Sequence, residues 1–251
     1  MSSCNIRFTM ERHSIPTLVF QMLIILACFA ISNAVQSDID CLRSIKEILE
    51  DPENLLSSWD FNSNTEGFVC RFTGIECWHP DESKVLNIRL SDMGLRGPFP
   101  VGLKNCTSLT TLDLSSNHLT GQLPSNVSDF MRFLTTLDLS SNNLSGPIPS
   151  SFADLSFINV LRLDNNQLTG EIPWELAGLD RIKEFDVANN RLSGQVPIFR
   201  NVAISADSYE GNLGLCGGPL LPRCVKRAEK DLFLAGFAVG FPFFLLWLRC
   251  L

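Results

Sequence analysis

The sequence predicts an α/β solenoid built from five short repeats, with one parallel sheet and a disulfide-stapled cap at each end. Three observations lead to this prediction: an apolar pattern that returns five times, an asparagine that follows it at a fixed distance, and close cysteine pairs on both sides of the repetitive region. Equivalent segments begin at Val85, Leu109, Leu134, Ile158 and Ile182, in steps of 24, 25, 24 and 24 residues. A fixed period of this length indicates a solenoid in which each turn buries its apolar face against its neighbours.

Each repeat contains a short stretch in which apolar and polar residues alternate. Such alternation predicts a strand with its apolar side chains turned inward, and stacked strands then form a parallel, concave sheet. The five stretches are residues 88–90, 112–114, 137–139, 161–163 and 185–187. Three residues after four of them comes an asparagine, whose buried amide can hydrogen-bond the backbone where the chain leaves the strand. The asparagines are Asn117, Asn142, Asn166 and Asn190, and Met93 stands at this position in the first repeat.

Each repeat continues with glycine, any residue, an apolar residue and proline. The glycine permits a tight backbone path, and the proline fixes φ and ends strand pairing. Residues 134–149 read Leu-Thr-Thr-Leu-Asp-Leu-Ser-Ser-Asn-Asn-Leu-Ser-Gly-Pro-Ile-Pro. This run resembles the plant-specific leucine-rich repeat almost letter for letter, which implies a leucine-rich-repeat superhelix of five plant-type repeats.

Residues 1–34 read as a signal peptide. Arg7 and Arg12 precede an apolar run over residues 18–30, and residues 32–34 are small enough for cleavage. We therefore expect the mature chain to begin near Val35 in an oxidising compartment.

Six cysteines remain in the mature chain outside its apolar tail, which fits an exported protein with disulfides. Two close pairs bracket the repeats, where a solenoid with open ends needs covalent staples, and we predict that both pairs are disulfides. These pairs are Cys70 with Cys77 and Cys216 with Cys224, which leaves Cys41 and Cys106 as a candidate third disulfide. Neither close pair has the spacing of a zinc site, so no metal or cofactor is expected.

The regions on both sides of the repeats resemble the caps of plant receptor-like kinase ectodomains. Apolar residues at helical spacing run from Ile39 to Leu49, and Trp78 follows the second cysteine of the segment 70–78. That tryptophan position, the five repeats and the ending Gly-Asn-Leu-Gly-Leu-Cys-Gly-Gly-Pro-Leu over residues 211–220 resemble the BAK-interacting receptor-like pseudokinases. The resemblance covers about residues 36–224. It implies an N-terminal cap at 35–84, five repeats at 85–199 and a C-terminal cap at 200–224.

The last segment is expected to cross a membrane once. After a juxtamembrane stretch at 225–231, residues 232–248 carry no charge and would span about 25 Å as a helix, against a hydrocarbon core of about 30 Å. Only a short cytoplasmic end, 249–251, follows, so the kinase-like domain of the resembling family is missing from this sequence. We expect a single-pass plasma-membrane protein with an extracellular repeat domain; the alternative is secretion to the apoplast.

Charge and chemistry exclude several classes of function. The formal net charge is −7, and eleven acids face four bases between Asp38 and Lys84, so nucleic acid is not an expected partner. Paired carboxylates such as Asp113 and Asp138 can act in glycoside hydrolysis, but aspartate is ordinary at this repeat position and no histidine or nucleophile accompanies them. We therefore expect neither an enzyme nor a binder of a small-molecule substrate.

The expected partner is another protein, bound on the concave sheet. Its charged residues concentrate in repeats four and five, which predicts a partner-binding face there, although a plain solvated face is the alternative. The four residues are Arg162, Asp164, Glu184 and Asp186. Glycosylation sequons occur at Asn105, Asn126 and Asn143, none of them in the strands of that sheet.

The resemblance implies a receptor-like negative regulator whose ectodomain binds the ectodomain of a five-repeat, somatic-embryogenesis-type co-receptor kinase in immune or growth signalling. A secreted or tethered inhibitor of the polygalacturonase-inhibitor type is the alternative, although such proteins usually have about twice as many repeats. A co-receptor identity is less favoured, because the Ser-Pro-Pro hinge of that family is absent between Cys224 and the apolar tail.

Overall fold

The computed structural model describes residues 36–63, 67–218 and 221–224, together with Met22 and Thr65. The predicted signal peptide, Met22 apart, lies outside these residues, as does the predicted membrane segment at 232–248. In the part of the chain that is described, no helix is long and apolar enough to span a bilayer.

An amphipathic helix opens the N-terminal cap over residues 36–48 and buries one face, including Leu42 and Ile45, against the first repeat. The cap continues through 3-10 turns η1 (Leu55–Ser58) and η2 (Phe68–Arg71) to strand β1 (Ile75–Cys77). Trp59 is fully buried: its ring stacks on Phe72 with centroids 5.6 Å apart, and its Nε1 donates to the Thr73 carbonyl at 2.9 Å. The cap therefore covers the open end of the core with its own small aromatic cluster.

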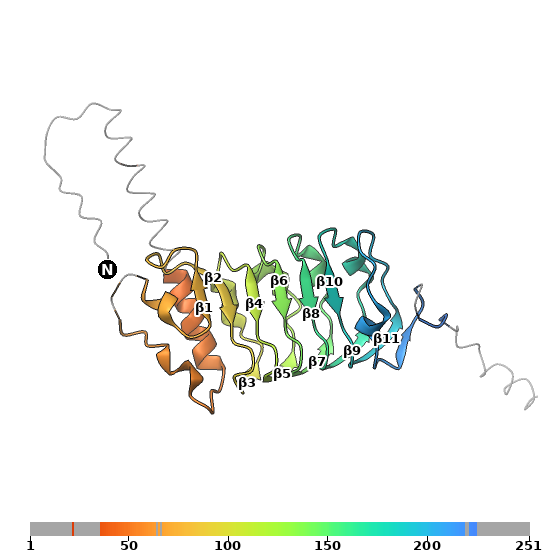
Figure 1. Ribbon diagram of the computed structural model, residues 1–251, viewed down its shortest axis with the longest axis horizontal. Coiled ribbons are helices and arrows are strands. Elements are labelled where there is room, and N and C mark those ends of the chain that lie inside the picture. Colours follow the sequence, from red (N-terminus) through yellow and green to blue (C-terminus); the bar gives the residue numbers. More distant parts are fainter. Residues whose placement is uncertain (1–21, 23–35, 64, 66, 219–220, 225–251) are drawn as a thin grey trace, which may run out of the picture.

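The repeats form two sheets that run along the molecule (Figure 1). The main sheet has the order β1-β2-β4-β6-β8-β10, in which β1 pairs antiparallel with β2 and all the other pairs are parallel. Its repeat strands are β2 (Val85–Arg89), β4 (Thr111–Asp113), β6 (Thr136–Asp138), β8 (Val160–Arg162) and β10 (Glu184–Asp186). Each of these strands contains the first two residues of an alternating stretch, so the solenoid fold predicted from the sequence is confirmed.

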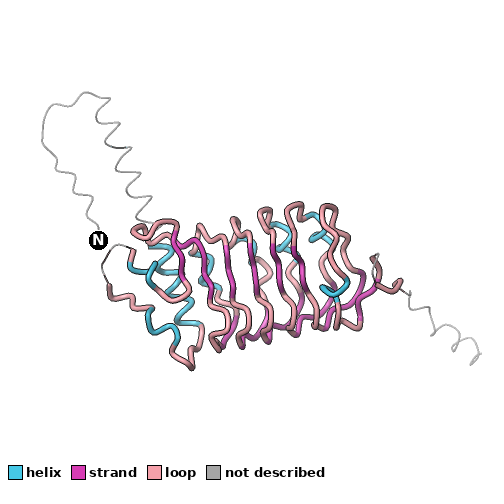
Figure 2. Tube along the Cα trace, in the orientation of Figure 1, coloured by secondary structure: helices cyan, strands magenta, loops and turns pink. Residues whose placement is uncertain are grey.

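Most strands of the second sheet include the glycine of a glycine-proline segment, and the strand order is β12-β11-β9-β7-β5-β3. Its strands are β3 (Arg96–Pro98), β5 (His118–Gln122), β7 (Asn143–Pro147), β9 (Gln167–Glu171), β11 (Arg191–Gln195) and β12 (Gly214–Cys216). Between the second sheet and the next main-sheet strand the chain makes only a short 3-10 turn (Figure 2). These turns are η3 (Val101–Asn105), η4 (Val127–Phe130), η5 (Ser150–Asp154) and η6 (Trp174–Gly178).

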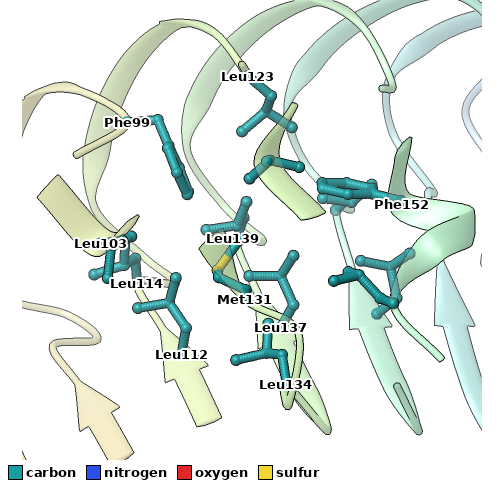
Figure 3. Packing of buried hydrophobic residues seen from close by; sticks show 14 of the residues in the cluster. Phe99, Leu103, Leu112, Leu114, Leu123, Met131, Leu134, Leu137, Leu139 and Phe152 are labelled. Atoms are coloured by element: carbon teal, nitrogen blue, oxygen red, sulfur yellow. The ribbon is translucent and has the colours of Figure 1, made fainter. Parts of the chain in front are cut away.

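The core fills the space between the sheets and the 3-10 turns. Leu112, Leu137 and Leu161 are paired in register on neighbouring strands and are fully buried. Figure 3 shows Leu112 and Leu137 pointing into the same interior, which Phe152 approaches from the opposite side. Burial of one such leucine contributes about 1.5–3 kcal/mol, so each stacked turn stabilises its neighbour.

The predicted asparagines form a continuous ladder. The Nδ2 of Asn142 donates to the carbonyls of Leu114, Leu139 and Ser140 at 2.9, 3.3 and 3.1 Å, and its Oδ1 accepts the amide of Leu119 at 2.9 Å. Each ladder amide thus joins two successive turns by hydrogen bonds to their backbone carbonyl and amide groups.

The ladder has one more member than the sequence predicted. Asn212 donates to the carbonyls of Val187 and Tyr209 at 2.9 and 3.1 Å, and it accepts the amide of Leu192 at 3.0 Å. The C-terminal cap therefore begins as a truncated sixth turn, formed by η7 (Ala206–Tyr209) and β12.

Three disulfides staple the caps. Cys70 is bonded to Cys77 and Cys216 to Cys224, over sequence separations of 7 and 8 residues. The two remaining cysteines, Cys41 and Cys106, form the third disulfide over a separation of 65 residues. This bond ties the cap helix to the end of η3 in the first repeat, and both of its cysteines are buried.

Asp38 joins the cap helix to the first repeat. Its side chain is fully buried and accepts the backbone amides of Val85 at 2.8 Å and Thr107 at 3.3 Å. Burial raises the pKa of this carboxyl from 3.8 to about 6, although both hydrogen bonds act in the opposite direction. The folded protein therefore holds this proton more tightly than the unfolded chain does.

We expect the free energy of unfolding to fall as the pH rises through the pKa of Asp38. The native pKa lies above the unfolded value, so the stabilising effect is fully present below pH 4 and is lost as pH rises through about 6. Two pKa units correspond to about 3 kcal/mol, which is the upper limit of the difference. Urea denaturation between pH 4 and 7 should show this decrease in the wild type and a flatter profile in Asp38→Asn. The control is Asp40→Asn on the same helix, and parallel profiles for wild type and Asp38→Asn would contradict the assignment.

Candidate protein-binding surface

The solvent-facing side of the main sheet, here called the main-sheet face, presents the side chains between the inward leucines. Strand pairing places Arg89 beside Asp113, Asp113 beside Asp138, Asp138 beside Arg162, and Arg162 beside Asp186. These five residues therefore form a charged column that is continuous along the sheet.

In the first three repeats, the charged side chains of this column form hydrogen bonds with neighbouring groups of the same chain. Arg89 donates to Glu76 at 2.8 Å, and Asn87 donates to the same carboxylate at 2.7 Å. These two hydrogen bonds hold the pKa of Glu76 below its usual value. Asp113 accepts both the amide and the hydroxyl of Ser115, at 3.0 and 2.7 Å, and Asp138 has the same arrangement with Ser140. These aspartates therefore stabilise the turn after the strand.

Repeats four and five differ. Arg162 lies between three carboxylates, 3.5 Å from Asp138, 3.7 Å from Asp164 and 3.5 Å from Glu184. Asp186 lies beside Arg162 in register and uses one oxygen to accept the amide of Ala188 at 2.9 Å. Burial raises the pKa of Asp186, and repulsion from Asp164 and Glu184 adds to this effect. The structure thus brings together the four residues that the sequence singled out and adds Asp138 to them; we call these five residues the acidic cluster.

A second feature of this region was not predicted. Phe133 and Phe157 are 54% and 37% exposed, their ring centroids are 6.1 Å apart, and the Arg181 guanidinium lies 5.1 Å from the centre of the Phe157 ring. The three residues occupy the same position in successive repeats, one residue before the apolar residue that opens each repeat. Large apolar residues at that position were the available sequence signal. We call these three residues the edge row.

Trp78 of the N-terminal cap approaches the same repeat position. It is 49% exposed, and its Nε1 donates to the carbonyl of Ser108, the residue that precedes the opening leucine of the second repeat. The Lys84 ammonium lies 5.5 Å from the centre of the tryptophan ring. Aromatic side chains are enriched in protein interfaces, and a cation over an aromatic face is attracted to it.

The sequons lie away from the main-sheet face. Asn126 precedes η4 and is exposed, and Asn143 is exposed at the start of β7 in the second sheet. Asn105 ends η3 and is half-buried, next to the disulfide-bonded Cys106. Among the described residues, no group of three histidine, cysteine, aspartate or glutamate side chains could hold a metal ion.

Family models match three parts of the chain. The leucine-rich-repeat N-terminal domain matches residues 35–78, and two leucine-rich-repeat models match residues 108–130 and 132–192. Among curated proteins, the chain is 56% identical over 206 residues to the inactive leucine-rich-repeat receptor-like serine/threonine-protein kinase BIR2 of Arabidopsis thaliana. The match covers 82% of this chain but only 34% of that relative, so the chain spans about a third of its length.

Two solved structures share this architecture. The crystal structure of the Arabidopsis thaliana BIR2 ectodomain matches with a TM-score of 0.73 and 48% identity, covering 74% of this chain and 98% of that one. A chain in the crystal structure of the BIR3–SERK2 complex from Arabidopsis thaliana matches with a TM-score of 0.70 and 42% identity, covering 75% and 100%.

Proposed function

Because this chain belongs to the leucine-rich-repeat receptor-like kinase family and carries the ectodomain of its BIR2-like members, we propose that it binds a co-receptor kinase ectodomain. The partner class follows from the BIR3–SERK2 complex, in which a chain of the same architecture takes part. The binding surface in this proposal combines the edge row with the acidic cluster on repeats three to five.

The edge row is the observation that carries the proposal. Monomeric proteins seldom leave two large aromatic rings in contact and exposed, unless a partner covers them. Phe157 is held between Phe133 and the Arg181 guanidinium, so its ring is oriented before binding and loses little freedom on association. Aromatic and arginine side chains are also the residues that most often contribute large shares of binding energy.

Such a protein acts by occupying the surface of its partner and needs no catalytic activity. While its ectodomain is bound, the co-receptor surface is unavailable to ligand-bound receptors, which makes this chain a negative regulator of immune or growth signalling. The BIR2 relative is described as an inactive kinase, which is consistent with a role that depends on binding alone. We propose that the chain is not an enzyme and that a protein is its functional ligand.

The proposal includes an extracellular location with one membrane anchor. The three disulfides require an oxidising compartment, and the uncharged stretch at 232–248 supplies the anchor. Glycans on Asn126 and Asn143 would leave the main-sheet face uncovered, since both side chains are exposed elsewhere. Asn105, half-buried beside a disulfide, is the least accessible of the three sequons.

Removal of the edge row should weaken binding. We expect Phe157→Ala combined with Arg181→Glu to reduce the affinity for the Arabidopsis thaliana SERK2 ectodomain at least about tenfold, because an oriented aromatic anchor and its neighbouring cation are lost together. Surface plasmon resonance with the purified, disulfide-bonded ectodomain measures this directly.

The matched control is Trp174→Ala. Trp174 is 76% exposed but lies in η6, outside the main-sheet face and the edge row, so its removal should leave the affinity within about twofold. Equal affinity of the edge-row variant and the wild type would refute the surface assignment, and absence of any binding by the wild type would refute the proposed function.

A further inference from the structure

The acidic cluster carries more negative charge than it neutralises. Its four carboxylates belong to Asp138, Asp164, Glu184 and Asp186. Among the described residues, Arg162 is the one cation within 4.0 Å of any of them. Four carboxylates share this single cation, so the cluster has an excess of three carboxylates over cations. The Glu184 side chain is 53% exposed, so part of this excess faces solvent.

The one cation present is held loosely. Its distances of 3.5 to 3.7 Å exceed the roughly 2.7–2.9 Å of a charge-assisted hydrogen bond. The Nε of Arg162 and the Oδ1 of Asp164 are both buried without a hydrogen-bond partner. Asp164 itself is only 7% exposed, so a carboxyl group with one unbonded oxygen lies at the base of the cluster. A buried charged atom without a partner is destabilising, and a further donor would relieve it.

At the N-terminal end of the main sheet, by contrast, the charged side chains have close partners. Arg89 and Glu76 meet at 2.8 Å, and Asp113 is satisfied by Ser115. Position 188, which corresponds to that serine, is alanine in the fifth repeat, so Asp186 receives no hydroxyl. The raised pKa of Asp186, caused by burial and by Asp164 and Glu184, reports the same crowding of negative charge.

We propose that the acidic cluster receives an arginine or lysine side chain from the bound partner. This inference rests on the proposed function and specifies the chemistry of the partner at that site. The incoming cation would contact Glu184 and Asp186 from the solvent side, while Arg162 moves closer to Asp138 and Asp164. Charge complementarity favours a basic partner surface, because the excess carboxylates would repel an acidic partner surface.

The test compares the wild type with Glu184→Gln/Asp186→Asn, which removes two charges and preserves shape. Binding of the Arabidopsis thaliana SERK2 ectodomain is measured by surface plasmon resonance at 50 and 500 mM NaCl. We expect the variant to bind about 5- to 20-fold more weakly at low salt and to respond less to salt, because the attraction to the partner cation is lost. Asp113→Asn is the matched control, with less than about a twofold effect, since the amide oxygen can still accept both Ser115 hydrogen bonds.

The outcomes separate this inference from the function on which it rests. If wild type and double variant bind with equal affinity and equal salt dependence, while the edge-row variant loses binding, the basic contact is wrong and the proposed function stands. If the wild type does not bind, both are wrong. Thermal melting checks the fold, and the double variant should melt at or above the wild-type temperature because two mutually repelling charges are gone.

Discussion

Asn166→Ala is expected to lower the free energy of unfolding by about 3–5 kcal/mol, because it removes four buried hydrogen bonds at once and each contributes about 0.5–1.5 kcal/mol. The Asn166 amide donates to the carbonyls of Leu139, Leu163 and Asp164 at 2.9, 3.1 and 3.2 Å. Its Oδ1 also accepts the amide of Leu144 at 3.0 Å. The residue lies in the fourth of five repeats, so the loss separates the turns on its two sides.

Urea denaturation followed by circular dichroism measures this loss. Asn201→Ala is the control, because Asn201 is exposed and makes a single hydrogen bond, to the carbonyl of Asp180 at 3.0 Å. That substitution should cost less than about 1 kcal/mol. A loss below about 1 kcal/mol for Asn166→Ala as well would mean that water replaces the amide, and that the ladder is not a source of stability.

Removal of the Cys41–Cys106 disulfide is expected to cost about 4 kcal/mol. The bond closes a loop over 65 residues, and the entropy that a cross-link removes from the unfolded chain grows with loop length. The double variant Cys41→Ala/Cys106→Ala should therefore unfold at a much lower urea concentration, with the cap helix detached from the first repeat.

The second cap disulfide is the internal comparison. Cys70→Ala/Cys77→Ala opens a loop over only 7 residues and should cost about 2.5 kcal/mol by the same relation. An equal or larger loss for this variant would contradict loop length as the dominant cause. Non-reducing peptide mapping of the wild type checks that all three bonds form in secreted protein.

Local spacing allowed most of the fold to be predicted. A strand of alternating residues, an asparagine three positions later and a glycine-proline segment each follow from neighbouring residues, and a 24-residue period stacks them in one way. The close cysteine pairs were predictable for the same reason, since short loops need little knowledge of the fold. The sequence did not reveal that the return path of each repeat is a 3-10 turn such as η5, because apolar spacing alone does not separate 3-10 from α-helical turns.

The proposed binding surface was only half predictable. Residues Arg162, Asp164, Glu184 and Asp186 were expected on one face from the strand pattern, and the stacking of β8 and β10 brought them together. That Arg162 is shared loosely among three carboxylates depends on side-chain distances, which no sequence pattern contains.

The sequence by itself determined the repeat, its register and which strand residues point inward or outward, because these depend on spacing within about 25 residues. The tertiary structure decided the contacts between distant or irregular positions. Cys41 reaches Cys106 and Asp38 reaches Val85 only because the cap helix packs across the first turn. Asn212 extends the ladder because the cap continues the solenoid, although its sequence departs from the repeat. Phe133, Phe157 and Arg181 become one surface because stacking places side chains about 24 residues apart within a few ångströms of each other.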